Sequence, residues 1–411
     1  MFYNVVVIGG GPAGLAAAIK ASENADVLLI EREARLGGIL KQCIHDGFGV
    51  VRFGEKLSGP EYADRFVRQL KKTSVKTSLF SFVTDVKRNG QGFDITYVSK
   101  EGVQKVQCDK IVLATGCRER TANGIFIQGD RCSGVFTAGA AQNLVNILGV
   151  LPGKRAVILG SGDIGLIMAR RLTLEGTKVL GVYEAKSTPS GLTRNIHQCL
   201  HDFDIPLHLS RTVTRVFGKT RLEGVEISQV DEKMRPIPGT AERIQCDTLV
   251  LAVGLIPENE VAKALSVPMD KRTKGAAVDQ TCQTVADGIY SCGNALHVND
   301  LVDYVSESGE TAGENAAKSA SVRNLVPINY NGNFLYGVPQ MLDVNADLSR
   351  VIVYFRASKP LTNQKLTVKV GGNVVFSKNY ARLLPPEMER VCVDFSQCEN
   401  IKDVEIVLED R

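Results

Sequence analysis

The feature that most constrains this chain is a glycine pattern that occurs twice, each time between two apolar segments. Residues 5–8 are apolar and are followed by GGGPAG, and the apolar residues 156–159 are followed by GSGDIG. In each copy a helix-forming segment comes next, and a second apolar segment then ends on a carboxylate, Glu31 or Glu184. This order predicts a strand, a tight turn, a helix and a second parallel strand, which together form a dinucleotide-binding unit.

Each part of the pattern has a physical task. The first glycine permits a tight turn, the second lets a pyrophosphate approach the backbone, and the third lets the helix pack on the strand. The helix N-terminus attracts phosphate, and the carboxylate can accept a hydrogen bond from a ribose hydroxyl. The glycines are Gly9, Gly11 and Gly14 in the first copy and Gly160, Gly162 and Gly165 in the second. The chain is therefore predicted to bind two dinucleotides, unless the second copy is kept only for packing.

Composition limits the remaining possibilities. A length of 411 residues predicts two or three domains. The formal net charge of +4 arises from intermixed charges of both signs, so we expect no nucleic-acid partner, and no apolar run suggests a transmembrane segment. The first strand begins at once, which leaves no room for a signal peptide, and the ten cysteines have neither Cys-x-x-Cys nor metal-site spacing. We expect a cytoplasmic protein without a metal site.

Further segments make the pattern specific to one family. They are LGGIL at 36–40, LSGPEYADRF at 57–66, IVLATG at 111–116, LVLAVGLIPEN at 249–259 and GIYSCGNA at 288–295. In this order they resemble the two-dinucleotide-binding flavoproteins of the pyridine nucleotide-disulfide oxidoreductase class, in the short form of low-molecular-weight thioredoxin reductase. The resemblance covers about residues 1–325. It implies that the first fingerprint binds FAD and the second binds NAD(P)H.

The resemblance also implies individual site residues. Gly293 and Asn294 stand where the family has Gly-Asp, a motif that meets the ribityl and pyrophosphate region of the flavin; Asn294 keeps a hydrogen-bonding side chain but lacks the charge. The further residues implied for FAD are Pro12, Ala13, Gly38, Ala114, Thr115, Gly116 and Ser308, and those implied for the nicotinamide nucleotide are Asp163, Ile164 and Gly254.

The implied fold class is α/β, with two interleaved Rossmann-like dinucleotide-binding domains and a small C-terminal all-β domain. The FAD-binding domain is expected at residues 1–118 and 280–328, with the NAD(P)-binding domain inserted at 119–279. From about residue 329 the chain contains five short β-rich runs, with Gly371-Gly372 as a hairpin signal, which predicts a β-sandwich-like domain over 329–411. This last domain is expected to be either a docking or oligomerisation module or a passive structural cap.

Two departures from the family pattern indicate which nucleotide and which acceptor the chain uses. NADP-specific members of the family place two arginines after the second strand of the nicotinamide unit, whereas this chain has Glu184 and Ala185 there, which favours NADH over NADPH. Thioredoxin reductases carry their redox Cys-x-x-Cys just before the second fingerprint, whereas this chain has Ala138 and Ala141 at those positions. The usual route to thioredoxin is therefore excluded.

Cys43 and His45 are the candidate catalytic residues. Peroxide-reducing members of the superfamily use a single cysteine near this depth in the chain, and an imidazole two residues away could lower the pKa of the thiol. The flanking residues KQCIH do not resemble the peroxidase motif, however. A second interpretation, in which Cys43 only packs beside the flavin and His45 is a structural hydrogen-bond partner, stays open.

A second polar group follows Asn294. His297, Asp300 and Asp303 are spaced to share one face if they are helical, either at the flavin or as a solvated charge face. Together with LGGILKQCIHDGFG at 36–49, this region resembles bacterial FAD-dependent oxidoreductases associated with glycerol-3-phosphate dehydrogenase. More distant relatives are flavin subunits of sarcosine-, opine- and amine-oxidising complexes.

These patterns predict an FAD-dependent oxidoreductase that transfers hydride from NADH to FAD and on to a partner protein, a peroxide or a small molecule. One alternative is a flavin subunit of a dehydrogenase complex that oxidises a small amine, an opine, sarcosine or glycerol 3-phosphate. An alternative of another class is a nucleotide-binding regulatory subunit without turnover. The expected partners are a small nicotinamide donor and either a protein electron partner or a second copy of the chain.

Overall fold

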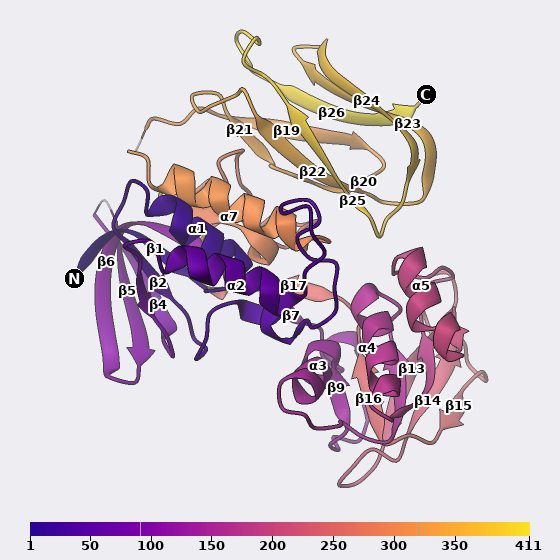
Figure 1. Ribbon diagram of the computed structural model, residues 1–411. Coiled ribbons are helices and arrows are strands. Elements are labelled where there is room, and N and C mark those ends of the chain that lie inside the picture. The colour runs from indigo at the N-terminus through magenta and orange to yellow at the C-terminus, as the bar shows by residue number, and fades with distance from the viewer. Residues whose placement is uncertain (91, 320) are drawn as a thin grey trace. The chain divides into compact units, whose positions relative to one another are not determined.

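The computed structural model describes residues 1–90, 92–319 and 321–411 (Figure 1). The chain forms two compact units, one of Met1–Cys117 with Pro257–Arg411 and one of Arg118–Ile256. The crossings between them are β7 (Cys117–Glu119) and β17 (Leu255–Pro257), which pair with each other.

Residues 257–279 belong to the first unit, whereas the inserted domain was expected to extend to residue 279. The reason is their burial: Ala262 in α6 (Glu260–Ala264), Val267, Ala276 and Val278 are part of the core of the first unit. The insertion therefore ends earlier, at Ile256.

The first unit is built on a seven-stranded sheet in which parallel strands surround the N-terminal strand. The strands are β1 (Phe2–Ile8), β2 (Val27–Ile30), β3 (Lys76–Ser78), β4 (Phe82–Asn89), β5 (Gly92–Ser99), β6 (Gly102–Leu113) and β18 (Ile289–Ser291). Strands β1 to β3, β6 and β18 pair in parallel, and β4, β5 and β6 form an antiparallel meander.

Three helices and two short 3-10 turns accompany this sheet. They are α1 (Pro12–Ala21), α2 (Gly59–Leu70), α7 (Val302–Ala316), η1 (Gly38–Gln42) and η4 (Gly293–Ala295). Helix α2 begins with a capping box between Ser58 and Glu61 and buries Tyr62, Phe66 and Leu70, which are spaced four residues apart on one face. Helix α7 packs directly on the backbone of α1 at Gly309, where a Cβ would lie only 2.2 Å from the oxygen of Ala13.

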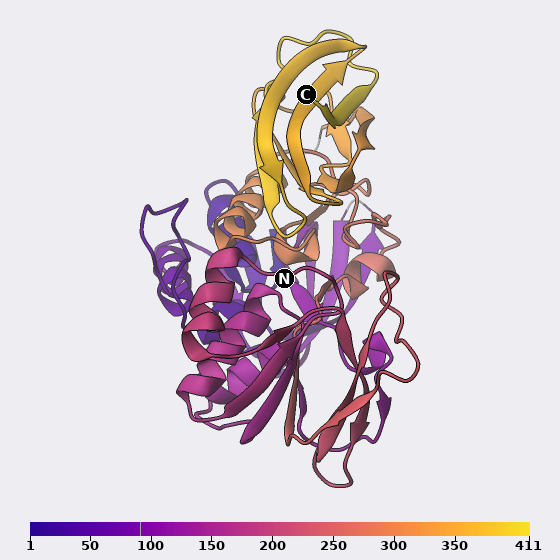
Figure 2. The ribbon, with the colours of Figure 1, turned by 90° about the vertical axis from the view of Figure 1, so that its right-hand side faces the viewer.

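The second unit has a five-stranded parallel sheet between a helical layer and a four-stranded sheet. Its parallel strands are β9 (Val135–Thr137), β10 (Arg155–Leu159), β11 (Lys178–Tyr183), β12 (Leu207–His208) and β16 (Thr248–Leu251), and its helices are α3 (Ala138–Asn146), α4 (Asp163–Leu174) and α5 (Thr193–Cys199). The four-stranded sheet contains β8 (Gln128–Gly129), β13 (Arg211–Phe217), β14 (Gly224–Gln229) and β15 (Glu242–Ile244), and the 3-10 turns are η2 (Asn123–Ile125) and η3 (His201–Phe203). Alternate residues of β10 enter the two cores, Ile158 on the helical side and Val157 on the other. Figure 2 shows the helices of this unit gathered on one face of its sheets.

The C-terminal residues of the first unit form two packed sheets with a core of their own. One sheet contains β19 (Leu325–Gly332), β21 (Met341–Asp343), β23 (Leu361–Val370), β24 (Asn373–Leu383) and β26 (Val404–Asp410), and the other β20 (Phe334–Val338), β22 (Val351–Ala357) and β25 (Met388–Val393). The five predicted runs correspond to β22 to β26, and the hairpin at Gly371-Gly372 is confirmed, since both residues have positive φ and Val370 pairs with Asn373. Strands β19 to β21 were not predicted, because a proline or glycines interrupt the alternation of β19 and β20 and because β21 has only three residues.

Candidate dinucleotide-binding sites

The parallel register of the first sheet gathers the predicted FAD residues at one edge. Ile8 lies opposite both Ile30 and Leu113, and Leu113 lies opposite Ser291. The strands therefore end side by side, and the residues that follow them are brought together: Gly9, Glu31, Ala114, Thr115, Gly116, Gly293 and Asn294. Ligands of doubly wound sheets bind at this carboxyl edge.

The fingerprint turn has the close contacts that its glycines predict. Gly9 has a φ of +107°, and a Cβ there would lie 2.3 Å from the oxygen of Ala114. A Cβ at Gly14 would lie 1.8 Å from the oxygen of Gly9, so α1 packs directly on the turn. Gly38 crosses over the turn, because its own Cβ would come within 2.9 Å of the Cα of Gly11.

The N-terminus of α1 is suited to a pyrophosphate. Gly11 is its N-cap residue, Pro12 occupies the first turn, and the first turn has neither a capping side chain nor an acidic residue. Glu31 is buried and accepts hydrogen bonds from the amides of Gly10 at 2.6 Å and Glu33 at 2.7 Å. Each carboxylate oxygen keeps a lone pair for a ribose hydroxyl, so the residues present fit the dinucleotide part of FAD.

Hydrogen bonds with Ser308, Asn299 and Cys117 hold the Gly293-Asn294 turn in place. The amide of Gly293 donates to the buried hydroxyl of Ser308 at 2.9 Å, so Ser308 supports the turn. The side-chain oxygen of Asn294 accepts from the amide of Asn299 at 3.0 Å, and its nitrogen donates to the sulfur of Cys117 at 3.5 Å. An aspartate at 294 could not donate to that sulfur, which gives the asparagine a physical role.

Thr115 and Gly116 have partners outside the turn. The hydroxyl of Thr115 donates to the oxygen of Glu258 at 2.6 Å, and the amide of Glu258 donates to the oxygen of Gly116 at 2.9 Å. These two residues therefore also tie the end of β6 to the chain that follows β17.

Cys43 ends the 3-10 turn η1 and is 8% exposed. Its thiol donates to the oxygen of Ile39 at 3.3 Å, and burial raises the pKa of the thiol to about 12. The ring of His45 lies against Phe48, and its Nδ1 is 3.2 Å from the oxygen of Asp46. Because burial and a high pKa both disfavour a thiolate, they support the packing interpretation of Cys43.

His297, Asp300 and Asp303 do not share a helical face, which corrects the prediction, because α7 begins only at Val302. Asp303 is buried and accepts from the amides of Arg52 at 2.8 Å and Gly49 at 3.3 Å. It therefore anchors the loop after Cys43 on α7. Nor do the three residues form a solvated charge face, since His297 is buried and Asp300 is paired with Arg356.

The second fingerprint repeats the geometry of the first. Gly160 has a φ of +103°, a Cβ at Gly165 would lie 2.3 Å from its oxygen, and a Cβ at Gly162 would meet no atom within 4 Å. Glu184 is buried and accepts from the amide of Ser161 at 3.1 Å and the amide of Lys186 at 3.0 Å. Unlike Glu31, Glu184 also accepts from the hydroxyl of Ser161 at 2.6 Å, so only its other oxygen keeps a lone pair for a ribose hydroxyl. With that oxygen, the second unit also fits a dinucleotide.

Three other predicted residues of the second unit have distinct positions. Asp163, in the first turn of α4, accepts from the amide of Leu192 at 2.9 Å and from the side chain of Asn195 at 2.7 Å, so it holds the segment after β11 beside the turn. Ile164 packs against the helical core. Gly254 accepts from the amide of Arg120 at 3.1 Å.

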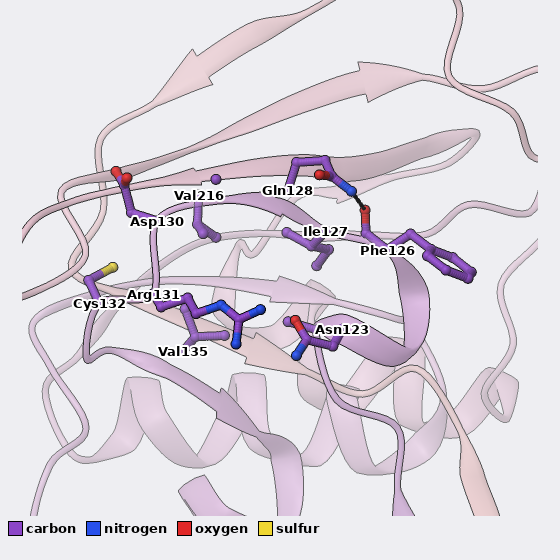
Figure 3. Close-up of a pocket in the computed structure, with 11 residues that line it drawn as sticks. Asn123, Phe126, Ile127, Gln128, Asp130, Arg131, Cys132, Val135 and Val216 are labelled. Carbon is purple, nitrogen blue, oxygen red and sulfur yellow. Dashed lines mark hydrogen bonds between the residues drawn. The ribbon is translucent and has the colours of Figure 1, made fainter.

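The second unit also has a hollow of about 370 Å³ between the segment 122–132 and β13. Figure 3 shows the guanidinium of Arg131 directed toward Asn123, with Val135 and Val216 nearby. The hollow is separate from the fingerprint turn.

Two further observations concern the helices. Ala138 and Ala141, where thioredoxin reductases have their cysteines, are fully buried in α3. Within the described residues, no helix has the length and apolar character needed to cross a membrane.

Comparison with known proteins supports the expected family. Residues 3–319 match the family model described as pyridine nucleotide-disulphide oxidoreductase. The chain is 27% identical over 340 residues to an opine oxidase subunit from Agrobacterium tumefaciens, covering 78% of this chain and 65% of that protein. It is 28% identical over 294 residues to the hydrogen cyanide synthase subunit HcnB of Pseudomonas protegens, covering 65% and 60%. The chain therefore spans less than two thirds of the length of these relatives.

Among solved structures, thioredoxin reductase of T. acidophilum superimposes with a TM-score of 0.63 and 20% identity, over 77% of this chain and 98% of that chain. This likeness confirms the predicted fold class. The predicted relation to opine-oxidising subunits is also confirmed, whereas the resemblance to proteins associated with glycerol-3-phosphate dehydrogenase stays a prediction.

Proposed function

Because the chain belongs to the pyridine nucleotide-disulphide oxidoreductase family, whose members use FAD and NAD(P)H, we propose that it takes hydride from NADH and delivers electrons through FAD to an acceptor other than thioredoxin. The observation that carries the proposal is the presence of two glycine-rich turns, each with no close contact at its second glycine and with a buried carboxylate at the end of the neighbouring strand. When bound, the flavin accepts hydride and passes its electrons on. The chain supplies binding, orientation and electrostatics.

In this proposal the first unit holds FAD. The amides at the start of α1 face the pyrophosphate, Glu31 accepts from a ribose hydroxyl, and the Gly293-Asn294 turn meets the ribityl chain. The N-terminus of α7 has no capping side chain, which leaves its amides available to a flavin carbonyl.

The preference for NADH rests on the charge at the end of β11. The Glu184 carboxylate can accept from a ribose hydroxyl and repels a 2'-phosphate, and Ala185 offers no cation. The acceptor cannot receive electrons through the dithiol of thioredoxin reductases, because alanines occupy both positions. The remaining acceptors are a partner protein, a peroxide or a small molecule.

A second candidate function follows from the relatives. Both curated relatives are named as subunits, one of an opine oxidase. The chain could thus serve as the flavin subunit of a complex that oxidises a small amine or a hydroxy compound, with a protein as its electron partner.

An anaerobic titration of the FAD-loaded protein with NADH, followed by flavin absorbance, tests the proposal. We expect complete reduction at about two electrons per FAD, since one flavin takes up that number. Uptake of about four electrons, lost in Cys43→Ser, would mean that Cys43 starts as a sulfenic acid that two of the electrons reduce to a thiol and water, and would make it a second redox centre. An oxidised flavin in excess NADH would refute the NADH assignment. Reduction by an opine or sarcosine instead would then favour the dehydrogenase-complex function, and no reduction by either donor would favour a regulatory role.

A further inference from the structure

One face of the sheet β20-β22-β25 is directed at the residues that follow the Gly293-Asn294 turn. Four side chains of this face form adjacent cross-strand pairs, Tyr336 with Arg356 and Tyr354 with Arg390. We call these four residues the clamp. Residues 293–308 are called the turn segment.

The first contact of the clamp is with Asp300. Its carboxylate accepts from the guanidinium of Arg356 and, at 2.6 Å, from the amide of Met388. Arg356 also donates to the hydroxyl of Tyr336 at 3.3 Å, and that hydroxyl donates to the oxygen of Val298 at 3.4 Å. The β20-β22-β25 sheet therefore holds both the side chain of Asp300 and the backbone at Val298.

The second contact is with Glu307. Its carboxylate accepts two hydrogen bonds from Arg390, at 2.8 and 2.6 Å, and one from the hydroxyl of Tyr354 at 2.5 Å. Burial would raise the pKa of Glu307, but the hydrogen bonds from Arg390 and Tyr354 keep that pKa below its usual value. Partly buried, bidentate pairs of this kind are stronger than exposed ones.

His297 fills the space between the two contacts. It is 1% exposed, and its ring lies 5.8 Å from the ring of Tyr336 and 5.4 Å from that of Tyr354. Burial, with the charge of Arg356 as a second cause, lowers the pKa of His297 to about 3. The imidazole is therefore neutral at physiological pH and packs as an aromatic residue.

The two clamped carboxylates are each one residue away from a support of the turn. Asn299, which holds Asn294, precedes Asp300, and Ser308, which holds Gly293, follows Glu307. We propose that the clamp is how the C-terminal β domain positions the Gly293-Asn294 turn for FAD, with Asp300 and Glu307 as positioning residues. This inference rests on the proposed function, because it requires FAD at the Gly293-Asn294 turn.

The experiment compares Glu307→Gln and Asp300→Asn with wild type in the full chain. Apoprotein is titrated with FAD, and the dissociation constant, the visible spectrum of the bound flavin and its midpoint potential are measured. We expect the dissociation constant of Glu307→Gln to rise about tenfold, the lower end of the effect that loss of one outer hydrogen-bonding partner has in metal sites. The spectrum at saturating FAD should also shift, because the turn then contacts the flavin differently.

Glu55→Gln is the matched control. Glu55 accepts two hydrogen bonds from Arg65, at 3.1 and 2.7 Å, but this pair is exposed and involves no residue of the turn segment. It should change FAD affinity by less than about twofold. Arg390→Lys, which keeps the charge but not the bidentate geometry, should fall between wild type and Arg390→Met.

The outcomes separate the two proposals. A wild-type apoprotein that does not bind FAD overturns the proposed function and this inference with it. If wild type binds FAD while Glu307→Gln and Asp300→Asn match it in affinity, spectrum and potential, only the clamp is overturned. Circular dichroism checks that each variant is folded. If FAD affinity and the flavin spectrum change only where circular dichroism shows loss of fold, in the control as well as in the two variants, the clamp is also refuted.

Discussion

Substitution of Gly309 by alanine tests the close packing of α7 on α1. The added Cβ would lie 2.2 Å from the oxygen of Ala13, whereas nonbonded heavy atoms prefer about 3.5–4.0 Å, so the helices must separate by about 1 Å or more. Overpacking costs roughly 1–3 kcal/mol, and alanine in a helix returns about 1 kcal/mol relative to glycine. Because a backbone oxygen cannot rotate away, the upper end of the cost applies, and we expect a net loss of about 2 kcal/mol.

Tyrosine fluorescence during urea unfolding is a suitable assay, since the chain has ten tyrosines and no tryptophan, and all but Tyr183 lie in the first unit. FAD affinity should fall as well, because Ala13 belongs to the first turn of α1. Glu314→Ala is the control: it lies on the exposed side of α7 and loses only a surface ion pair with Lys318. A Gly309→Ala protein as stable as wild type, with unchanged FAD affinity, would refute the close-packing argument.

Three further predictions concern single residues. Burial raises the pKa of Cys43 from 9.0 to about 12, so the contribution of the thiol to stability is complete below pH 9 and is lost as the pH rises toward 12. Iodoacetamide should therefore label Cys43 slowly in the native protein, and rapid labelling at neutral pH would contradict this. The pKa of His297 is lowered from 6.5 to about 3, so its contribution is complete above pH 6.5 and is lost as the pH falls. His297→Phe should remove about 2 kcal/mol of the stability loss between about pH 7 and about pH 5, measured by urea unfolding at both values. Asp303→Asn should weaken the anchoring of residues 49–52 by roughly 1–3 kcal/mol, seen as faster limited proteolysis there, and an unchanged cleavage rate would exclude that role.

The predictions that succeeded depend on local requirements of the chain. The turns at Gly9 and Gly160 require positive φ and close packing, and the hairpin at Gly371-Gly372 requires two residues of positive φ, so each position is visible in the sequence. Strand β19 was not predicted, because its pairing with the distant strand β26 outweighs the proline and glycine within it.

The functions of the charged residues were hidden for a different reason. Asp303 binds the amide of a residue 251 positions away, and Asp300 pairs with an arginine 56 positions away. No periodicity connects such residues, and the i, i+3 spacing around Asp300 suggested a helical face that does not exist. The boundary of the inserted domain was misplaced similarly, since burial of residues 257–279 in the first core leaves no compositional signal.

By itself, the sequence determined that this chain has two dinucleotide-binding units with a carboxylate at the end of each second strand. Glycine is the only residue that satisfies both the backbone geometry and the close approach at these turns, so the pattern has one physical solution. Only the tertiary structure decided which carboxylates face solvent and which hold the chain in place. An ion pair or a buried hydrogen bond depends on which partner the path of the chain brings within reach, and many arginines in the sequence are equivalent until the fold selects one.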